Sequence, residues 1–158
     1  MFNIVIAGIA IFLLALYLLK VSKNKKAAVG NLSKGAEFLL ANSQQEGVKT
    51  TDSGLQYKVL EEGSGSQHPD ASDKVKVHYH GTLIDGTVFD SSVDRGEPIS
   101  FGLNQVIKGW TEGLQLMVVD EKTRLFIPST LGYGNRSAGK IEPGSVLIFD
   151  VQLLGINE

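Results

Sequence analysis

The sequence predicts an α+β domain in which antiparallel strands wrap around one short helix, with two helices before it. Three observations carry this prediction. Several short segments alternate apolar and polar residues, residues 104–116 have helical periodicity, and the N-terminus is one uncharged apolar run. The chain has 158 residues, enough for one domain of ordinary size and an appendage.

The N-terminal run predicts a transmembrane helix over residues 1–19. Residues 4–19 read IVIAGIAIFLLALYLL, and no charged residue precedes them. The uncharged stretch therefore covers residues 1–19, close to the ~20 residues needed to cross a bilayer. A cleaved signal peptide is the alternative, but Lys20 and Val21 follow where a small-residue cleavage site is needed. Four lysines follow the run and none precedes it, so the positive-inside rule places the following domain in the cytoplasm rather than the periplasm.

Residues 20–54 are predicted to be a basic flank, a short amphipathic helix and a linker. Apolar residues recur at helical spacing within residues 31–42, and either Asn31 or Ser33 would cap this helix. Residues 47–54 read GVKTTDSG, a composition typical of a linker. The globular domain is therefore expected to span residues 55–158.

Alternation within this domain predicts a series of strands joined by turns. The expected strands are residues 55–60, 74–83, 87–90, 99–101, 121–128 and 145–154. The dipeptide Asp85-Gly86 predicts the turn of a hairpin, and residues 129–142 a long glycine-rich loop.

The hairpin ends on an aromatic residue and an acid, Phe89 and Asp90. Strand alternation turns Tyr79 toward the interior, beside this pair. A carboxylate among aromatic rings is costly to bury unless it is paired, and Arg95 can supply the partner. We therefore expect Asp90 to be a buried, ion-paired carboxylate.

Composition excludes several classes of function. The chain contains no cysteine, which excludes disulfides, a thiolate nucleophile and a Cys-ligated metal. Residues 27–158 hold eleven Lys and Arg against seventeen Asp and Glu, a net charge near -6, so no nucleic acid is expected as a partner.

Two other kinds of site are weighed against the same segment. His78 and His80 lie two apart on one strand, but no third ligand is evident, so we expect exposed strand histidines and no metal. Ser91, His78 and Asp90 are the residue types of a hydrolase triad, but alternation turns His78 away from the Tyr79 face.

Five separated motifs together resemble one family. The motifs are VHYHGTLIDGTVFDSS (residues 77–92), PISF (98–101), VIKGWTEGLQLM (106–117), the IP-x-x-LGYGN run (127–135) and SVLIFDVQLL (145–154). In this order they resemble the FKBP-type peptidyl-prolyl cis-trans isomerases over about residues 50–156. The preceding segment is similar to Mip-like bacterial members that carry a helical N-terminal arm. The resemblance implies an FKBP-like antiparallel sheet wrapped around the short helix.

The resemblance also implies an aromatic substrate pocket. Its catalytic residues would be Tyr79, Phe89, Asp90, Val106, Ile107, Trp110, Tyr133 and Phe149. Residues that bind substrate or inhibitor would be Arg95, Ile99, Phe101 and Ile141. Trp110 would form the floor, Tyr133 and the Ile107 N–H would donate hydrogen bonds, and Asp90 would be held by Tyr79 and Arg95. Ile99 replaces a frequent aromatic, and residues 136–142 differ from the His-Pro-Gly sequence of the best-known members, which bears on substrate preference.

The implied activity is isomerisation of X-Pro bonds in unfolded or newly made proteins, without a cofactor or a metal. Tacrolimus and rapamycin are the inhibitors that the resemblance implies. The alternative is a non-catalytic chaperone or peptide-binding module that uses the same pocket. The short predicted arm favours a monomer, and the apolar run predicts a single pass in the bacterial inner membrane.

Overall fold

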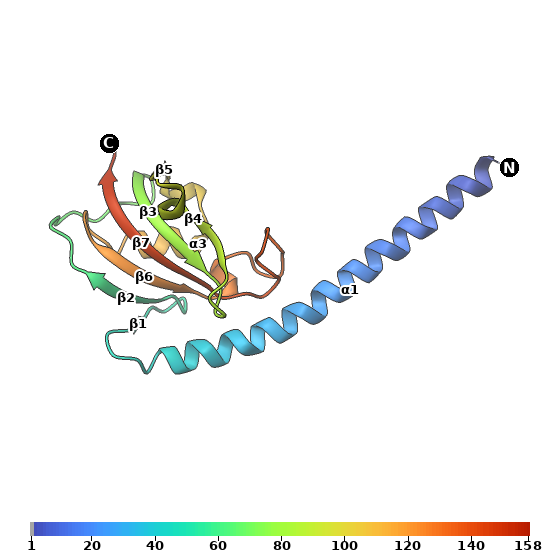
Figure 1. Ribbon diagram of the computed structural model, residues 1–158, viewed down its shortest axis with the longest axis horizontal. Coiled ribbons are helices and arrows are strands. Elements are labelled where there is room, and N and C mark those ends of the chain that lie inside the picture. The colour runs from blue at the N-terminus through green and yellow to red at the C-terminus, as the bar shows by residue number, and fades with distance from the viewer. Residues whose placement is uncertain (1) are drawn as a thin grey trace.

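The computed structural model describes the backbone of residues 2–158 and the side chains of residue 9 and residues 11–158. Within these residues, seven strands form one antiparallel sheet that wraps around a short helix, and a long N-terminal helix extends away from the sheet (Figure 1). The predicted antiparallel sheet around one helix is confirmed.

The elements follow the predicted order along the chain. The helices are α1 (Phe2–Asn42), α2 (Ser92–Arg95) and α3 (Lys108–Leu114), with 3₁₀ turns η1 (Leu103–Gln105) and η2 (Ser129–Leu131). The strands are β1 (Lys49–Thr50), β2 (Gln56–Glu61), β3 (Lys74–Thr82), β4 (Val88–Ser91), β5 (Ile99–Gly102), β6 (Lys122–Ile127) and β7 (Leu147–Ile156). Their order in the sheet is β1-β2-β6-β7-β3-β4, with β5 paired to β3.

The core lies between the sheet and α3. Alternate residues of β7 are buried, as expected for a strand with one face toward the interior. The helix comes very close to β6, because a Cβ on Gly109 would lie 2.5 Å from Ile127 Cγ2 and one on Gly113 2.8 Å from Leu125 Cδ1. The two glycines therefore make room for the sheet.

The helix predicted over residues 104–116 is shorter in the structure. Val106 is extended, with φ -118° and ψ 176°, and separates η1 from α3. A one-turn helix, α2, follows β4 and was not predicted. Ser91 begins it by accepting a hydrogen bond from the Asp94 N–H at 3.1 Å, and Gly96 ends it with φ +71°.

The prediction of a transmembrane helix over residues 1–19 is wrong. No helix in the described part of the chain is both long enough and apolar enough to cross a membrane. The helix α1 does not end with the apolar run but continues past it through a lysine-rich stretch. The side chains of residues 1–8 and 10 lie outside the described ones. The predicted localisation, a single-pass inner-membrane protein with a cytoplasmic domain, depended on this helix and is wrong with it.

The short amphipathic helix is also corrected. Residues 2–42 form one continuous helix of 41 residues, and β1 lies within the segment predicted as a linker. Residues 20–30 contain no proline and several good helix formers, so nothing interrupts the backbone hydrogen bonds before Asn42. The N-terminal arm is therefore long. The prediction of a monomer rested on a short arm, so this argument no longer applies.

Replacement of Gly109 by alanine tests the close approach of α3 to β6. The new methyl group would meet the fully buried Ile127, so we expect the free energy of unfolding to fall by about 1–3 kcal/mol. Gly30→Ala is the matched control, because no atom lies within 4 Å of its Cβ position and alanine favours a helix. Urea unfolding measures both. A Gly109→Ala protein as stable as the parent would contradict the packing described.

Candidate functional site

A cavity of about 980 Å³ is lined by residues of α3, of β3, β4, β5 and β7, and of the segment after β6. Eleven of the twelve predicted site residues line it. They are Tyr79, Phe89, Asp90, Ile99, Phe101, Val106, Ile107, Trp110, Tyr133, Ile141 and Phe149. Arg95 is the exception, and it contacts the site through Asp90 and Tyr79.

Trp110 lies at the centre of the aromatic residues. Its ring centroid is 5.1 Å from those of Tyr79 and Phe149 and 5.3 Å from that of Phe101. Phe89 packs edge-on against Phe149 at 5.2 Å. Edge-to-face contacts of this kind fix ring orientations as well as burying area. The indole is 5% exposed, so the floor of the cavity is a rigid apolar surface.

Backbone features place these rings. Tyr79 points inward because β3 alternates, and its neighbour on the same face, Gly81, leaves room for two rings. A Cβ on Gly81 would lie 2.7 Å from Phe89 and 2.9 Å from Phe149. Ile107 precedes the first turn of α3, where N–H groups have no acceptor inside the helix.

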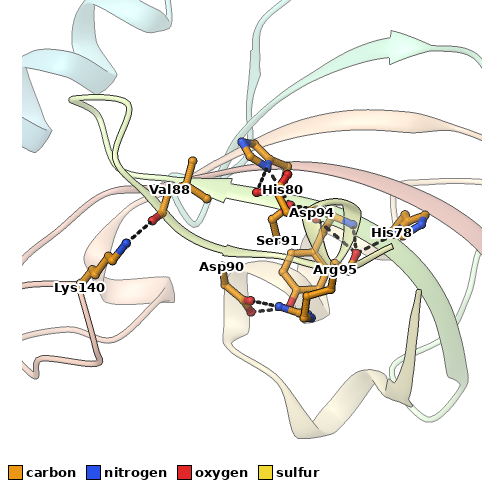
Figure 2. Close-up of polar contacts among 10 residues, drawn as sticks. His78, His80, Val88, Asp90, Ser91, Asp94, Arg95 and Lys140 are labelled. Carbon is orange, nitrogen blue, oxygen red and sulfur yellow. Dashed lines mark hydrogen bonds and ion pairs between the residues drawn. The ribbon is translucent and has the colours of Figure 1, made fainter. Parts of the chain in front are cut away.

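Asp90 is held by two partners. The Tyr79 hydroxyl donates a hydrogen bond to one carboxylate oxygen and the Arg95 guanidinium pairs with the other, while Arg95 Nη2 also donates to the Tyr79 hydroxyl at 3.1 Å. Figure 2 shows the carboxylate and the guanidinium facing one another. The Asp90 side chain is 44% exposed and that of Arg95 49%. The expected ion pair is present, but it lies at the edge of the cavity and not in a buried position.

Protonation of the pair follows from these contacts. Partial burial by itself raises the pKa of Asp90, but the hydrogen bond from Tyr79 and the charge of Arg95 outweigh it and lower that pKa below its ordinary value of 3.8. Burial, together with the bond to Asp90, raises the pKa of Tyr79. At neutral pH the site therefore holds a carboxylate and a neutral phenol.

The two histidines are half-buried, although exposed histidines were expected. His78 Nδ1 lies 2.8 Å from Ser92 Oγ, and His80 Nδ1 lies 2.9 Å from Ser91 Oγ. Ser92 Oγ also accepts a hydrogen bond from the Tyr79 N–H at 2.8 Å. The histidines therefore tie β3 to the start of α2 (Figure 2). The described residues contain no group of three or more side chains that could hold a metal ion.

A hydrolase triad does not form from the residues that were weighed. The hydroxyl group nearest His78 is that of Ser92, and the carboxylate of Asp90 faces Tyr79 and Arg95. A triad requires the acid to orient the base, and here the acid lies with a different pair.

Ten residues that line the cavity, six of them with polar or charged side chains, were not predicted as site residues. They are Gln105, Lys108, Thr130, Asn135, Arg136, Ala138, Gly139 and Lys140, together with Gly132 and Gly134. Most belong to the long glycine-rich loop, whose length was the one available signal. Lys140 Nζ approaches the Val88 carbonyl at 3.4 Å and so connects this loop to β4 (Figure 2).

Comparison with known proteins decides the family. A family model described as FKBP-type peptidyl-prolyl cis-trans isomerase matches residues 65–154, and one described as the domain amino-terminal to it matches residues 14–59. The chain belongs to the FKBP-type peptidyl-prolyl cis-trans isomerase family. The stated resemblance is thereby confirmed.

Individual FKBP relatives agree with this assignment. The chain is 59% identical over 137 residues to the FKBP-type isomerase FkpA of Aeromonas hydrophila, covering 87% of this chain and 51% of the relative. It is 48% identical to the outer membrane protein MIP of Legionella longbeachae, covering 85% and 58%. The crystal structure of FkpA from Escherichia coli superposes with a TM-score of 0.89 at 43% identity, covering 95% of this chain and 70% of that one. The chain thus spans about half the length of the curated relatives it matches.

Removal of the Arg95 charge tests the electrostatics of the FKBP site. In Arg95→Met we expect the pKa of Asp90 to rise, because one of the two contacts that stabilise its charged form is lost. A depressed pKa contributes stability that is present above the unfolded value of 3.8 and is lost as pH falls through the folded value. The Arg95→Met protein should therefore lose less stability on acidification.

Carboxyl NMR titration measures this pKa, and urea unfolding measures the stability. Arg124→Met is the matched control, since Arg124 pairs with Asp150 at 2.5 Å, away from the cavity. An Asp90 pKa that is the same in the parent and in Arg95→Met would show that the ion pair does not set it.

Proposed function

We propose that the protein catalyses cis-trans isomerisation of X-Pro bonds in protein substrates by enclosing the prolyl segment in the aromatic cavity. The observation that carries this proposal is the cavity itself, a concave site with an aromatic floor around the buried Trp110. Membership of the FKBP family supports it. The substrates are unfolded or newly made chains that present an accessible proline.

The chemistry needs neither a covalent intermediate nor a cofactor. Rotation about a peptide bond has a barrier of ~18–20 kcal/mol because conjugation holds it planar. The planar amide is more polar than the twisted transition state, so transfer from water to an apolar site favours the twisted form. The floor formed by Trp110, Tyr79 and Phe149 supplies this environment.

Hydrogen-bond donors at the wall would hold the bound chain. Tyr133 lines the cavity, and the N–H of Ile107 stands at the start of α3, so both suit carbonyl oxygens on either side of the proline. Asp90 acts on the floor by orienting Tyr79, and Arg95 keeps that carboxylate charged. Ile99, Phe101, Val106 and Ile141 complete the apolar surface. Tacrolimus and rapamycin are proposed to compete for the same cavity.

The rate of isomerisation of a short X-Pro peptide tests the function on the full chain. Phe89→Ala and Asp90→Ala should lower kcat/KM by about tenfold or more, which corresponds to ~1.4 kcal/mol of transition-state stabilisation. Leu60→Ala is the matched control, because Leu60 is exposed on β2 and does not line the cavity. All variants are compared after urea unfolding has established their folded fraction.

A parent protein that leaves the uncatalysed rate unchanged would contradict catalysis. Suppression of aggregation by that same protein would then favour the non-catalytic chaperone or peptide-binding module. Loss of the suppression in Phe89→Ala would place its binding in the cavity.

A further inference from the structure

One wall of the cavity is formed by a loop. Residues 129–146, here called the cavity loop, lead from β6 to β7 and supply Tyr133 and Ile141. A long surface loop is normally mobile, because few buried apolar contacts fix it. What holds the cavity loop in place therefore bears directly on the shape of the site.

The end of the cavity loop is packed against α1. Asn31 Nδ2 donates a hydrogen bond to the Pro143 carbonyl at 2.9 Å and lies 3.4 Å from Glu142 Oε2. Ala28 is only 4% exposed, and a Cβ on Gly144 would lie 2.7 Å from its carbonyl oxygen. Figure 1 shows the C-terminal half of α1 running alongside the domain. The helix and the loop are thus in close backbone contact.

A second contact lies one turn further along the helix. A Cβ on Gly35 would lie 2.8 Å from Val146 Cγ2, and Val146 is itself buried. Valine is stiff about χ1, so its side chain has little freedom to move aside. Gly35 and Val146 therefore fix the distance between α1 and the start of β7.

Backbone hydrogen bonds connect the loop residues that contact α1 to the residues that line the cavity. The Gly144 N–H donates to the Gly134 carbonyl at 2.8 Å, and the Gly134 N–H donates to the Ser129 carbonyl at 2.8 Å. Tyr133 is the residue before Gly134, and it lines the cavity. Only this hydrogen bond and one peptide unit separate Gly144 from Tyr133. A displacement of residues 142–144 therefore also displaces Tyr133.

We propose that α1 positions the cavity loop, and that Asn31 and Gly35 are positioning residues for the reaction. This inference depends on the proposed isomerase function for its kinetic consequence. Neither residue reaches the substrate. The helix holds the loop in the conformation that binds substrate. The conformational entropy lost on binding is therefore smaller than it would be for a free loop.

Two variants of the full chain test the contact at independent points. Asn31→Ala removes the hydrogen bond to Pro143, and Gly35→Ala places a methyl group against Val146. Asn42→Ala is the control for the first, because Asn42 Nδ2 bonds to Gln56 Oε1 at 2.8 Å, at the far end of the same interface. Gly30→Ala is the control for the second, since its Cβ meets no atom within 4 Å.

Amide hydrogen exchange reports the loop directly and does not require activity. We expect exchange at Gly134 and Gly144 to accelerate by about two- to tenfold in Asn31→Ala, the factor that corresponds to one net hydrogen bond, and to accelerate also in Gly35→Ala, where the new methyl group displaces Val146. The amides of β3 and β7 should exchange as in the parent, as should all of these amides in the two controls. Unchanged exchange at Gly134 and Gly144 in both variants would overturn the proposal.

Kinetics of peptide isomerisation report the consequence for the site. We expect KM to rise by about two- to fivefold with kcat little changed, because the loop acts on binding. A variant that merely unfolds would lower the apparent kcat and leave KM unchanged. Faster exchange with unchanged KM would overturn the positioning role. An inactive parent protein would refute the proposed function. Hydrogen exchange would still show whether α1 holds the cavity loop in place.

Discussion

The close approach of α3 to β6 is the constraint on which the rest of the site depends. Gly109 and Gly113 bring the helix against Ile127 and Leu125, and this distance fixes the height of Trp110 above the sheet. The indole in turn contacts Tyr79 and Phe149, which come from two neighbouring strands. The apolar floor is therefore a part of the hydrophobic core left open on one side, and it has the rigidity of a core.

Polar groups are kept at the edge of this floor. Asp90, Arg95 and the Tyr79 hydroxyl satisfy one another, so no unpaired charge points into the cavity from this side. Because both side chains of this ion pair are nearly half-exposed, the free-energy cost of removing them from water is small, and so is the contribution of the pair to stability. Its effect is geometric, because Tyr79 is fixed at its hydroxyl by the pair and at its N–H by Ser92.

Alternation and turn residues predicted the sheet and the hairpin, because a strand that is buried on one face alternates apolar and polar residues. The resemblance supplied the site residues, and the structure brings all but Arg95 to one cavity. The N-terminal prediction took the end of the apolar run as the end of a helix, whereas α1 continues through the charged residues to Asn42. The partners of His78 and His80 were missed because they lie on α2 and its cap, a single turn without periodicity.

The two sides of the cavity are held by different means. Trp110, Tyr79 and Phe149 are fixed by core packing, which cannot shift without loss of the fold. Tyr133 and Ile141 belong to a loop whose conformation depends on local hydrogen bonds and on the helix behind it. The apolar floor is therefore set by the core, whereas the shape of the loop wall depends on contacts outside the core. In the proposed arrangement the long arm supports this wall, at the surface where residues 28–35 of α1 contact residues 142–146.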